Sequence, residues 1–438
     1  MRFQAPKGTR DFYPRDMAWR NYLVDAWRRV SVRNGFEQVD GPIFEPLDLY
    51  RVKSGEGIVS ELFHFQDRGK RELAIRPEFT PTLARMVADQ AHALPKPIKW
   101  FCTSNFCRAE RPPRGRFREF WQWNLDIVGF DPGGAPLADA ECIFTAVDLL
   151  QELGLGPEHV RIKISHRQMI RHILERLGVR QEKLLEAYDL LDRRDKMHSD
   201  QFTRAAMDLG LDEPTVMRFD QVCRRKYATG DLDHLRRSIG MDPQDDELGA
   251  LDTQLQAFGI SPWCEYDLGI VRGLAYYTGM VFEVHEHSGA ERAMAGGGRY
   301  DGLIELFGGP ALAAVGFGMG DAVITNVLTD KELVPRDIGP KPDVFVIAVG
   351  QEAPARLHPL VAALRRAGLH ARYSYRSTQN LGKLLKEATT ARARYAVILD
   401  DGVQEGRANL KDLGTGEQEQ VGLDDLVARI GGQARSGE

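Results

Sequence analysis

Apolar side chains recur every three or four residues in two early segments, which is the spacing of a helix that buries one face. In residues 14–35 this pattern ends at Asn34-Gly35, a typical helix stop, and residues 137–151 show the same spacing. We therefore expect a helix in each segment. The apolar face of the first helix is formed by Met17, Tyr22, Leu23, Trp27 and Val30.

Other segments alternate with a period of two, as strands do. Residues 98–130 predict two strands around a loop rich in Pro, Gly and Arg, and residues 36–50 read as strand and turn. In "LAIRPEFTPTLARMVADQA" a strand should lead into a helix, with Thr80 as its cap and Pro81 at its first position. The stretch "RGLAYYTGMVFEVHE" is less regular, because Arg272 stands between two apolar runs and its charge needs a partner.

The pattern changes in the second half of the chain. Charged segments with helical spacing fill residues 166–260, strands return at Glu265, and a segment rich in Pro and Lys follows. The last part alternates strand, helix, strand, helix, strand, which favours a parallel sheet. We expect an α+β fold in four parts: a body made of 1–165 and 261–332, a helical insertion at 166–260, a linker at 333–342 and an α/β domain at 343–438.

Composition narrows the class of protein. The 438 residues suit two or three domains, and 43% hydrophobic and 28% charged residues are ordinary for a globular protein. No apolar run approaches the roughly 18 residues of a membrane helix, and the N-terminal segment is not a signal peptide. Five scattered cysteines without a CxxC pair indicate neither zinc nor disulfides, so a reducing cytoplasm fits best. The net charge of −5 still permits a local nucleic-acid-binding face.

The loop "CRAERPPRGRFREF" concentrates five arginines between Arg108 and Arg118. If it joins two antiparallel strands, several guanidinium groups project into one space, where they could bind phosphate in bidentate fashion. A solvated basic loop is the alternative. The strand that follows carries Gln122, Asn124 and Asp126 on one face, and this polar stripe favours a binding pocket.

Three further motifs carry weaker signals. Glu78 and Thr80 point the same way in an extended segment and could hold an ammonium group, although a plain helix cap explains them better on its own. The segments "AGGGRYDGL" and "GFGMGD" permit close backbone approach to a ligand but match no dinucleotide or P-loop pattern. His285 and His287 could face one way on a strand, but no third metal ligand is evident, so a solvated strand end explains them better.

Together these motifs resemble those of histidyl-tRNA synthetases, a family of class II aminoacyl-tRNA synthetases. Arg108, Glu110, Arg116 and Phe120 match the second class II motif, although Cys107 stands where an aromatic residue is usual. "KGTRDFYP", "RPEFT", "RGLAYYTG" and "GGGRYDGL" follow in the family's order, and the last domain resembles its anticodon-binding domain. The resemblance spans almost the whole chain and implies a class II catalytic domain with an antiparallel sheet.

The resemblance also implies roles for the matching residues. Asp126 would accept a hydrogen bond from the imidazole of histidine, and Arg272 would bind the α-phosphate of ATP. The histidine-binding residues would be Glu78, Thr80, Gln122, Asp126, Tyr276, Tyr277 and Tyr300. The ATP-binding residues would be Arg108, Glu110, Arg116, Phe120 and Arg272, of which Arg108 and Arg272 would be catalytic.

The implied reaction is the ATP-dependent ligation of L-histidine to the 3′ end of tRNA(His) through a histidyl-adenylate. Mg²⁺ would accompany ATP, the enzyme would be a cytoplasmic homodimer without a membrane partner, and basic residues in 343–438 would contact the anticodon. Two further positions depart from the family pattern. Ala275 stands where many relatives have Asp, and Val323 stands where the third class II motif places an arginine for the γ-phosphate.

A non-catalytic regulator is the alternative interpretation. The synthetase-like regulatory subunit of ATP phosphoribosyltransferase shares the catalytic fold but usually lacks an anticodon-binding tail. Ala275 and Val323 favour the regulator, whereas the tail, Arg108 and Arg272 favour the synthetase.

Overall fold

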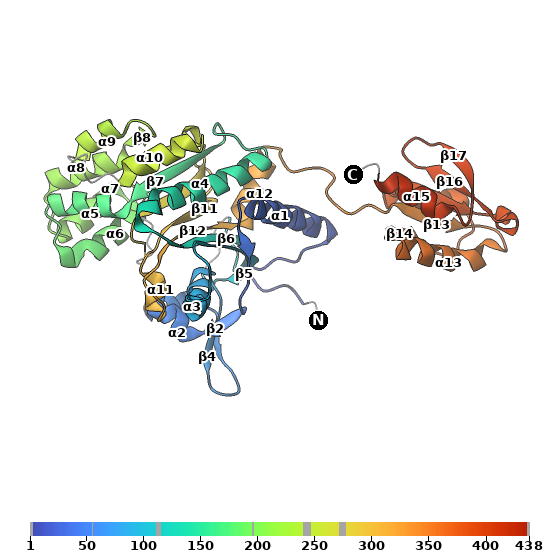
Figure 1. Cartoon of the computed structure of the whole chain (residues 1–438), viewed down its shortest axis with the longest axis horizontal. Coiled ribbons are helices and arrows are strands. Elements are labelled where there is room, and N and C mark those ends of the chain that lie inside the picture. The colour runs from blue at the N-terminus through green and yellow to red at the C-terminus, as the bar shows by residue number, and fades with distance from the viewer. Residues whose placement is uncertain are drawn as a thin grey trace. The chain divides into compact units, whose positions relative to one another are not determined.

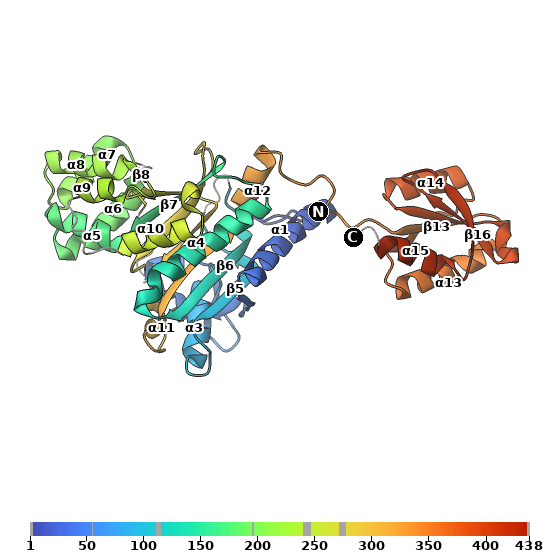
Figure 2. The same cartoon turned by 45° about the horizontal axis from the view of Figure 1, so that its top comes forward.

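The computed structural model describes residues 3–54, 56–110, 115–194, 197–239, 247–270 and 277–435. The chain divides into two compact units, Met1–Arg336 and Asp337–Glu438 (Figures 1 and 2). The four-part division expected from the sequence stays a prediction. No helix in the described part of the chain combines enough length with enough apolar character to cross a lipid bilayer.

A mostly antiparallel sheet forms the centre of the first unit (Figure 1). Within the described residues its strand order is β1-β5-β6-β12-β11-β10-β7-β9-β8, with β1–β5 and β7–β9 as the parallel pairs. The expected α+β fold is confirmed. The strands are β1 (Glu37–Gln38), β5 (Ile98–Cys107), β6 (Glu119–Phe130), β7 (Val160–His166), β8 (Lys226–Ala228), β9 (Cys264–Asp267), β10 (Met280–Glu286), β11 (Ala295–Arg299) and β12 (Ala313–Gly320).

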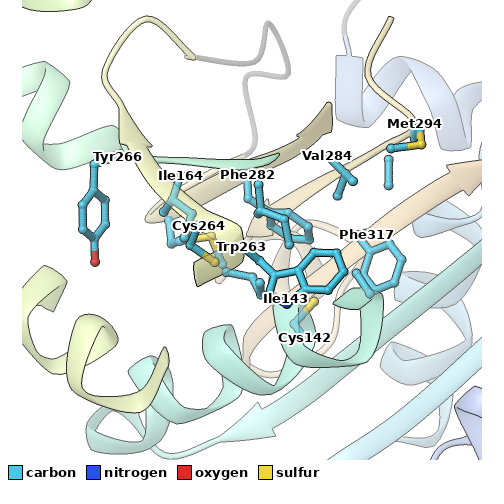
Figure 3. Close-up of a cluster of buried hydrophobic side chains, with 14 of the residues drawn as sticks. Cys142, Ile143, Ile164, Trp263, Cys264, Tyr266, Phe282, Val284, Met294 and Phe317 are labelled. Carbon is cyan, nitrogen blue, oxygen red and sulfur yellow. The ribbon is translucent and has the colours of Figure 1, made fainter. Parts of the chain in front are cut away.

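One face of this sheet is buried under two helices, α1 (Pro14–Arg33) and α4 (Ala135–Glu152), which lie across β5 and β6 (Figure 2). Both helices were predicted from their spacing. Trp123 of β6 stacks on Trp27 of α1, with 6.4 Å between ring centroids, and meets Phe317 of β12 edge-on at 4.9 Å. Figure 3 shows Phe317 and Phe282 in the same core. Successive side chains of a strand project from opposite faces of a sheet. The residues that alternate with these apolar ones therefore project from the other face, which α1 and α4 do not cover.

A small sheet and two helices follow α1. They are β2 (Phe44–Pro46), α2 (Leu47–Ser54), β3 (His64–Gln66), β4 (Glu72–Ile75) and α3 (Thr80–Gln90), with a 3-10 helix at Glu56–Glu61. Two expectations are wrong here. Residues 47–50 begin a helix rather than a turn, because Leu47 and Tyr50 are buried beside Ala74. Phe79, not Thr80, occupies the cap of α3 without a capping hydrogen bond, and its fully buried ring holds the helix start.

Residues 166–260 are mainly helical, as expected, but they add β8 to the edge of the large sheet, where it pairs with β9. Phe202 and Leu235 belong to the same buried cluster as the sheet. The helices are α5 (Arg167–Arg176), α6 (Leu184–Arg193), α7 (Ser199–Asp208), α8 (Glu213–Arg224), α9 (Leu232–Ile239) and α10 (Glu247–Ala257). The first unit ends with α11 (Leu303–Leu306) and α12 (Asp321–Asp330).

A buried group of charges ties α10 to the sheet. Arg299, at the end of β11, forms an ion pair with Asp139 of α4 and donates from Nη1 to Glu247 of α10 at 3.1 Å. His166, at the end of β7, contacts the same Glu247 carboxylate at 2.8 Å. Arg299 is 5% exposed, so its guanidinium group needs these carboxylates to offset the loss of water.

The second unit has its own sheet, ordered β14-β13-β15-β16-β17 within the described residues. β13 pairs in parallel with β14 and β15, which confirms the predicted parallel alternation. The antiparallel hairpin β16–β17, which contains the "DLGTGEQ" turn, was not predicted. The elements are β13 (Val344–Ala348), α13 (Ala353–Arg366), β14 (Ala371–Tyr373), α14 (Leu381–Thr390), β15 (Tyr395–Leu399), β16 (Arg407–Asp412), β17 (Gln418–Gly422) and α15 (Leu426–Arg435).

Candidate active site

The polar stripe on β6 lies beside a strand of glycines. Gln122, Asn124 and Asp126 stand opposite Gly320, Gly318 and Gly316 of β12, respectively. Side chains alternate along a strand, so these positions share the face of the sheet that is not covered by α1 and α4. The glycines leave space above β12 that the polar side chains of β6 can enter.

Two of these glycines are required by close contacts. A methyl group at Gly316 would overlap the Asp126 carboxylate and lie 2.7 Å from the carbonyl oxygen of Leu125. A methyl group at Gly318 would lie 2.5 Å from Gln122 Nε2. The polar side chains of β6 therefore lie over β12, and only glycine on β12 leaves room for them.

Asp126 is buried close to two of the expected tyrosines. The Tyr300 hydroxyl donates to Asp126 Oδ1, and both residues are buried. Burial, together with the Asp126 charge, raises the pKa of Tyr300 well above its ordinary value, so the hydroxyl stays a donor. Tyr277 belongs to the same buried cluster as Tyr300. Thr278 and Asp301, which follow the two tyrosines, are joined by a 2.9 Å hydrogen bond that holds these segments together.

The hairpin loop between β5 and β6 borders a cavity of about 470 Å³. Arg108, Glu110, Arg116 and Phe120, all expected to bind ATP, line this cavity together. Arg116 pairs with Glu110, and the Arg108 guanidinium lies 5.1 Å from the centre of the Phe120 ring. The side chains predicted from the loop are therefore gathered in one place, where they can surround a phosphate group.

The "RPEFT" segment is anchored by its arginine. Arg76 is 3% exposed, and its Nη1 donates to Asp40 Oδ1 at 2.7 Å. Arg76 Nε also donates to the carbonyl oxygen of Asn105 in β5 at 3.1 Å, and Arg108 Nε donates to that of Pro77, next to Glu78, at 3.2 Å. Desolvation lowers the pKa of Arg108, and the Glu78 charge opposes that shift. The side chain of Thr80 makes no hydrogen bond to the other described site residues.

The "KGTRDFYP" segment joins the hairpin loop to α12. Arg10 forms a 2.7 Å ion pair with Asp321, the first residue of α12, and its guanidinium lies 3.9 Å from the centre of the Phe117 ring. The carbonyl oxygen of Gly8 also accepts a hydrogen bond from the Arg118 N–H at 2.7 Å. Three distant segments therefore fix one wall of the cavity.

Some expected site residues are not placed. Arg272 and Tyr276 lie outside the described residues, as does Ala275. Val323 is placed: it lines the cavity, and a methyl group at Gly115 would lie 3.5 Å from its Cγ2. An apolar side chain thus occupies the position where the third class II motif has an arginine.

Glu283 and Arg292 line the cavity although no sequence motif assigned either a role, and His285, expected at a solvated strand end, lines it as well. Glu283 and His285 share a 2.8 Å hydrogen bond, and strand alternation could have put both on the site face. His287 instead contacts the carbonyl oxygen of Pro157 at 3.0 Å.

The part of the chain that the structure describes has no group of three side chains able to hold a metal ion.

Asn124 belongs to the polar stripe, but no sequence motif assigns it a role. It is 3% exposed, and its Oδ1 accepts from Gln122 Nε2 at 2.6 Å. Its Nδ2 is buried without a hydrogen-bond partner among the described residues. Buried donors are usually paired, so this amide is a candidate to bind the substrate.

An antiparallel sheet that carries an arginine-bearing hairpin loop beside a glycine strand defines the catalytic unit of a class II aminoacyl-tRNA synthetase. Residues 8–321 match the family model for histidyl-tRNA synthetase, and residues 343–433 match that for the anticodon binding domain. The chain belongs to the histidyl-tRNA synthetase family.

Individual relatives agree with this assignment. The histidine–tRNA ligase of Opitutus terrae is 37% identical over 437 residues, which cover 98% of each chain. The chloroplastic/mitochondrial histidine–tRNA ligase of Arabidopsis thaliana is 36% identical over 422 residues, 96% of this chain and 85% of the relative. The similarity therefore extends through both units.

Solved structures share the fold at lower identity. A histidyl-tRNA synthetase from Nostoc sp. PCC 7120 superposes with a TM-score of 0.78 at 23% identity, covering 98% of this chain and 99% of that one. An ATP phosphoribosyltransferase regulatory subunit/histidyl-tRNA synthetase from Bacillus halodurans C gives 0.74 at 20% identity, covering 91% and 99%. The catalytic and regulatory interpretations therefore share this fold, and the choice between them depends on the site and the sequence.

Proposed function

We infer that the chain ligates L-histidine to tRNA(His) in an ATP-dependent reaction through a histidyl-adenylate. One observation carries this inference: Gly318 lines the cavity bordered by the arginine loop and also lies beneath Gln122 of the polar stripe. A nucleotide and an amino acid bound there would meet over one strand. The similarity to histidine–tRNA ligases over nearly the whole chain, including the anticodon-binding domain, favours this activity over the regulatory alternative.

We propose that Asp126, Tyr277 and Tyr300 recognise the imidazole. An ionised carboxylate has more acceptor positions than the one that Tyr300 uses, so Asp126 can also accept a hydrogen bond from an imidazole N–H. Amino acids that lack this donor would forgo a hydrogen bond in a buried site. Readout of this kind can discriminate by about 10⁴–10⁵. Glu78, Thr80 and Gln122 are proposed to hold the α-amino group, as in the family motif.

The first step needs stabilisation of charge rather than a covalent enzyme intermediate. A carboxylate oxygen of histidine attacks the α-phosphorus of ATP, the bond to the bridging oxygen breaks, and pyrophosphate leaves with the electron pair. We propose that Arg108 and Arg272 stabilise this charge, while Arg116, Glu110 and Phe120 position the nucleotide. Preorganised positive charge and orientation are together sufficient for large rate enhancements.

In the second step a hydroxyl of the terminal ribose of tRNA attacks the carbonyl carbon of the adenylate, and AMP leaves.

Mg²⁺ is proposed to enter with ATP. It favours phosphate oxygens with one or two carboxylates, and Glu283 lines the cavity as a suitable carboxylate. When bound, Mg²⁺ neutralises part of the triphosphate charge.

The second unit offers a surface for single-stranded RNA. The Tyr375 ring is 88% exposed and lies 5.0 Å from the Tyr373 ring, between centroids, with the exposed Arg376 next in sequence. Exposed aromatic rings beside arginines are suited to stacking on unpaired bases. We propose that this surface contacts the anticodon.

A homodimer is also proposed. Apolar side chains are exposed around the small sheet of the first unit, and the rings of Phe44 and Phe65 lie 6.2 Å apart there. Clustered exposed apolar residues commonly mark an interface. A mass near 49.2 kDa, the mass of one chain, measured by sedimentation equilibrium would contradict the dimer. The five free thiols suit a reducing compartment, and we propose the cytoplasm.

The decisive experiment measures exchange of labelled pyrophosphate into ATP, with and without histidine, followed by charging of tRNA(His). The wild type should show histidine-dependent exchange. Arg272→Ala should slow exchange by at least about 10²-fold, since removing one group that stabilises transition-state charge typically costs 10²–10³-fold. Arg237→Ala, which changes an exposed arginine on α9, should exchange normally. Histidine-independent exchange, or none, would refute the function, and normal exchange by Arg272→Ala would refute that residue's role.

A further inference from the structure

The cavity contains a cationic side chain that the proposed mechanism does not use. Arg292 lines it from the turn between β10 and β11 and is exposed. Arg292 makes no hydrogen bond or ion pair with any described residue. The other charged groups nearby are engaged, since Arg116 pairs with Glu110, and Glu283 is hydrogen-bonded to His285. Arg292 therefore has a guanidinium group available for an anion in the cavity.

The backbone on both sides of Arg292 is fixed. Glu291 is 8% exposed and accepts from Asn326 Nδ2 of α12 at 3.3 Å. Met294 is 2% exposed, and its N–H donates to the carbonyl oxygen of Val284 at 2.8 Å. Because these anchors flank it, Arg292 is held at one wall of the cavity, and only its side chain is free to reach a ligand.

Val323 lines the same wall of the cavity, and its side chain carries no charge. A methyl group at Gly115 would lie 3.4 Å from Glu291 Oε2 and 3.5 Å from Val323 Cγ2. The neighbour of Arg292, the start of α12 and the hairpin loop therefore meet at one point. The isopropyl group of Val323 cannot bind phosphate. The guanidinium group of Arg292, the residue after Glu291, can do so with two hydrogen bonds.

We propose that Arg292 binds the terminal phosphate of ATP and, once the bond at the α-phosphorus has broken, the departing pyrophosphate. This proposal rests on the proposed function and deepens it, because it names the residue that supplies the contact absent at Val323. Arg108 and Arg272 act at the α-phosphate, where the reaction takes place. Arg292 binds the leaving group, so different arginines act on these two parts of ATP.

The test uses the full-length protein and compares two ligands. In pyrophosphate exchange, Arg292→Ala should raise the KM for pyrophosphate and for ATP by about tenfold or more, as expected for a lost charge-assisted contact. The KM for histidine should stay within about twofold of the wild type. A sulfamoyl analogue of histidyl-adenylate lacks pyrophosphate, so its Kd should also stay within about twofold. Arg292→Lys should fall between wild type and Arg292→Ala, since it keeps charge but loses the fork.

Two results would overturn the proposal. One is an active wild type together with an unchanged KM for pyrophosphate in Arg292→Ala. The other is an equal loss of pyrophosphate and analogue binding, which would indicate damage to the fold of the site. Arg237→Ala should match the wild type in all four measurements. A wild type without histidine-dependent exchange would instead count against the proposed function itself.

Discussion

At the scale of single residues, buried charges in the first unit meet a partner from a distant part of the chain. Asp126 meets Tyr300, and Arg299 meets Asp139 and Glu247. A buried charge left alone would cost several kcal/mol. The sequence motifs contain Asp126, Arg299 and Tyr300, but not Asp139 or Glu247. No local pattern shows that Asp126 meets Tyr300 or that Asp139 meets Arg299, because each of these pairs is separated by more than a hundred residues.

The contacts of Glu247 with His166 and Arg299 predict that the stability of the fold depends on pH. The hydrogen bond with His166 and the Arg299 charge lower the pKa of Glu247 from 4.5 to about 2, although partial burial acts against them. A lowered folded-state pKa stabilises the fold above pH 4.5, and this contribution is lost as the pH falls toward 2. Glu247→Gln should therefore reduce the free energy of unfolding at pH 7 by about 1 kcal/mol, a modest value because Glu247 is half exposed.

Urea unfolding followed by tryptophan fluorescence measures this effect, because all six tryptophans lie in the first unit. The difference between wild type and Glu247→Gln should shrink as the pH is lowered from 4.5 toward 2. Glu182→Gln, which alters an exposed ion pair with Arg180, serves as the control and should have little effect at any pH. A Glu247→Gln difference that is the same at pH 7 and pH 3 would rule out this explanation.

At the scale of elements, the two faces of β12 have different roles. Val315, Phe317 and Met319 are buried in the core, while Gly316 and Gly318 make room for polar side chains from β6. One strand thus supports the fold and the site together.

This arrangement predicts the effect of a single methyl group. Gly316→Ala would push the Asp126 carboxylate away from its position, and displacements of about 1 Å at a site can cost 10²-fold in rate. We expect a loss of that size in kcat/KM for histidine in pyrophosphate exchange, with a smaller change in the KM for ATP. Gly302→Ala is the matched control, because a methyl group there meets nothing within 4 Å and its φ of −90° suits alanine. Equal effects of the two substitutions would contradict the steric argument.

Regular elements were largely predictable from the sequence, and departures have physical causes. α1, β5 and β6 follow from spacing because each buries a continuous face. The start of α3 was misplaced by one residue because Phe79 is held by packing rather than by a capping hydroxyl. Arg292 was missed because it lies in a turn, where neither spacing nor the resemblance distinguishes it from an ordinary surface arginine.

At the scale of the whole molecule, the two units carry different parts of the proposed reaction. Tyr375→Ala removes the exposed ring proposed to stack on an anticodon base, and stacking contributes about 1–3 kcal/mol per base. The KM for tRNA(His) in charging should rise about fivefold or more, while pyrophosphate exchange without tRNA should be unchanged.

Tyr375→Phe keeps the ring and loses only the 3.3 Å hydrogen bond to Tyr373, so it should charge tRNA almost as the wild type does. If Tyr375→Ala charges normally, the ring does not contact the anticodon. If it also slows exchange, the effect is not confined to tRNA binding.

The buried clusters of the two units share no residue within the described part of the chain. Each unit therefore has a buried core built from its own residues. The choice of amino acid and the choice of nucleic acid are thus open to separate selection. A lineage whose tRNA changes its anticodon loop could adapt the second unit alone, and an engineer could exchange that unit while leaving the proposed histidine-binding residues untouched.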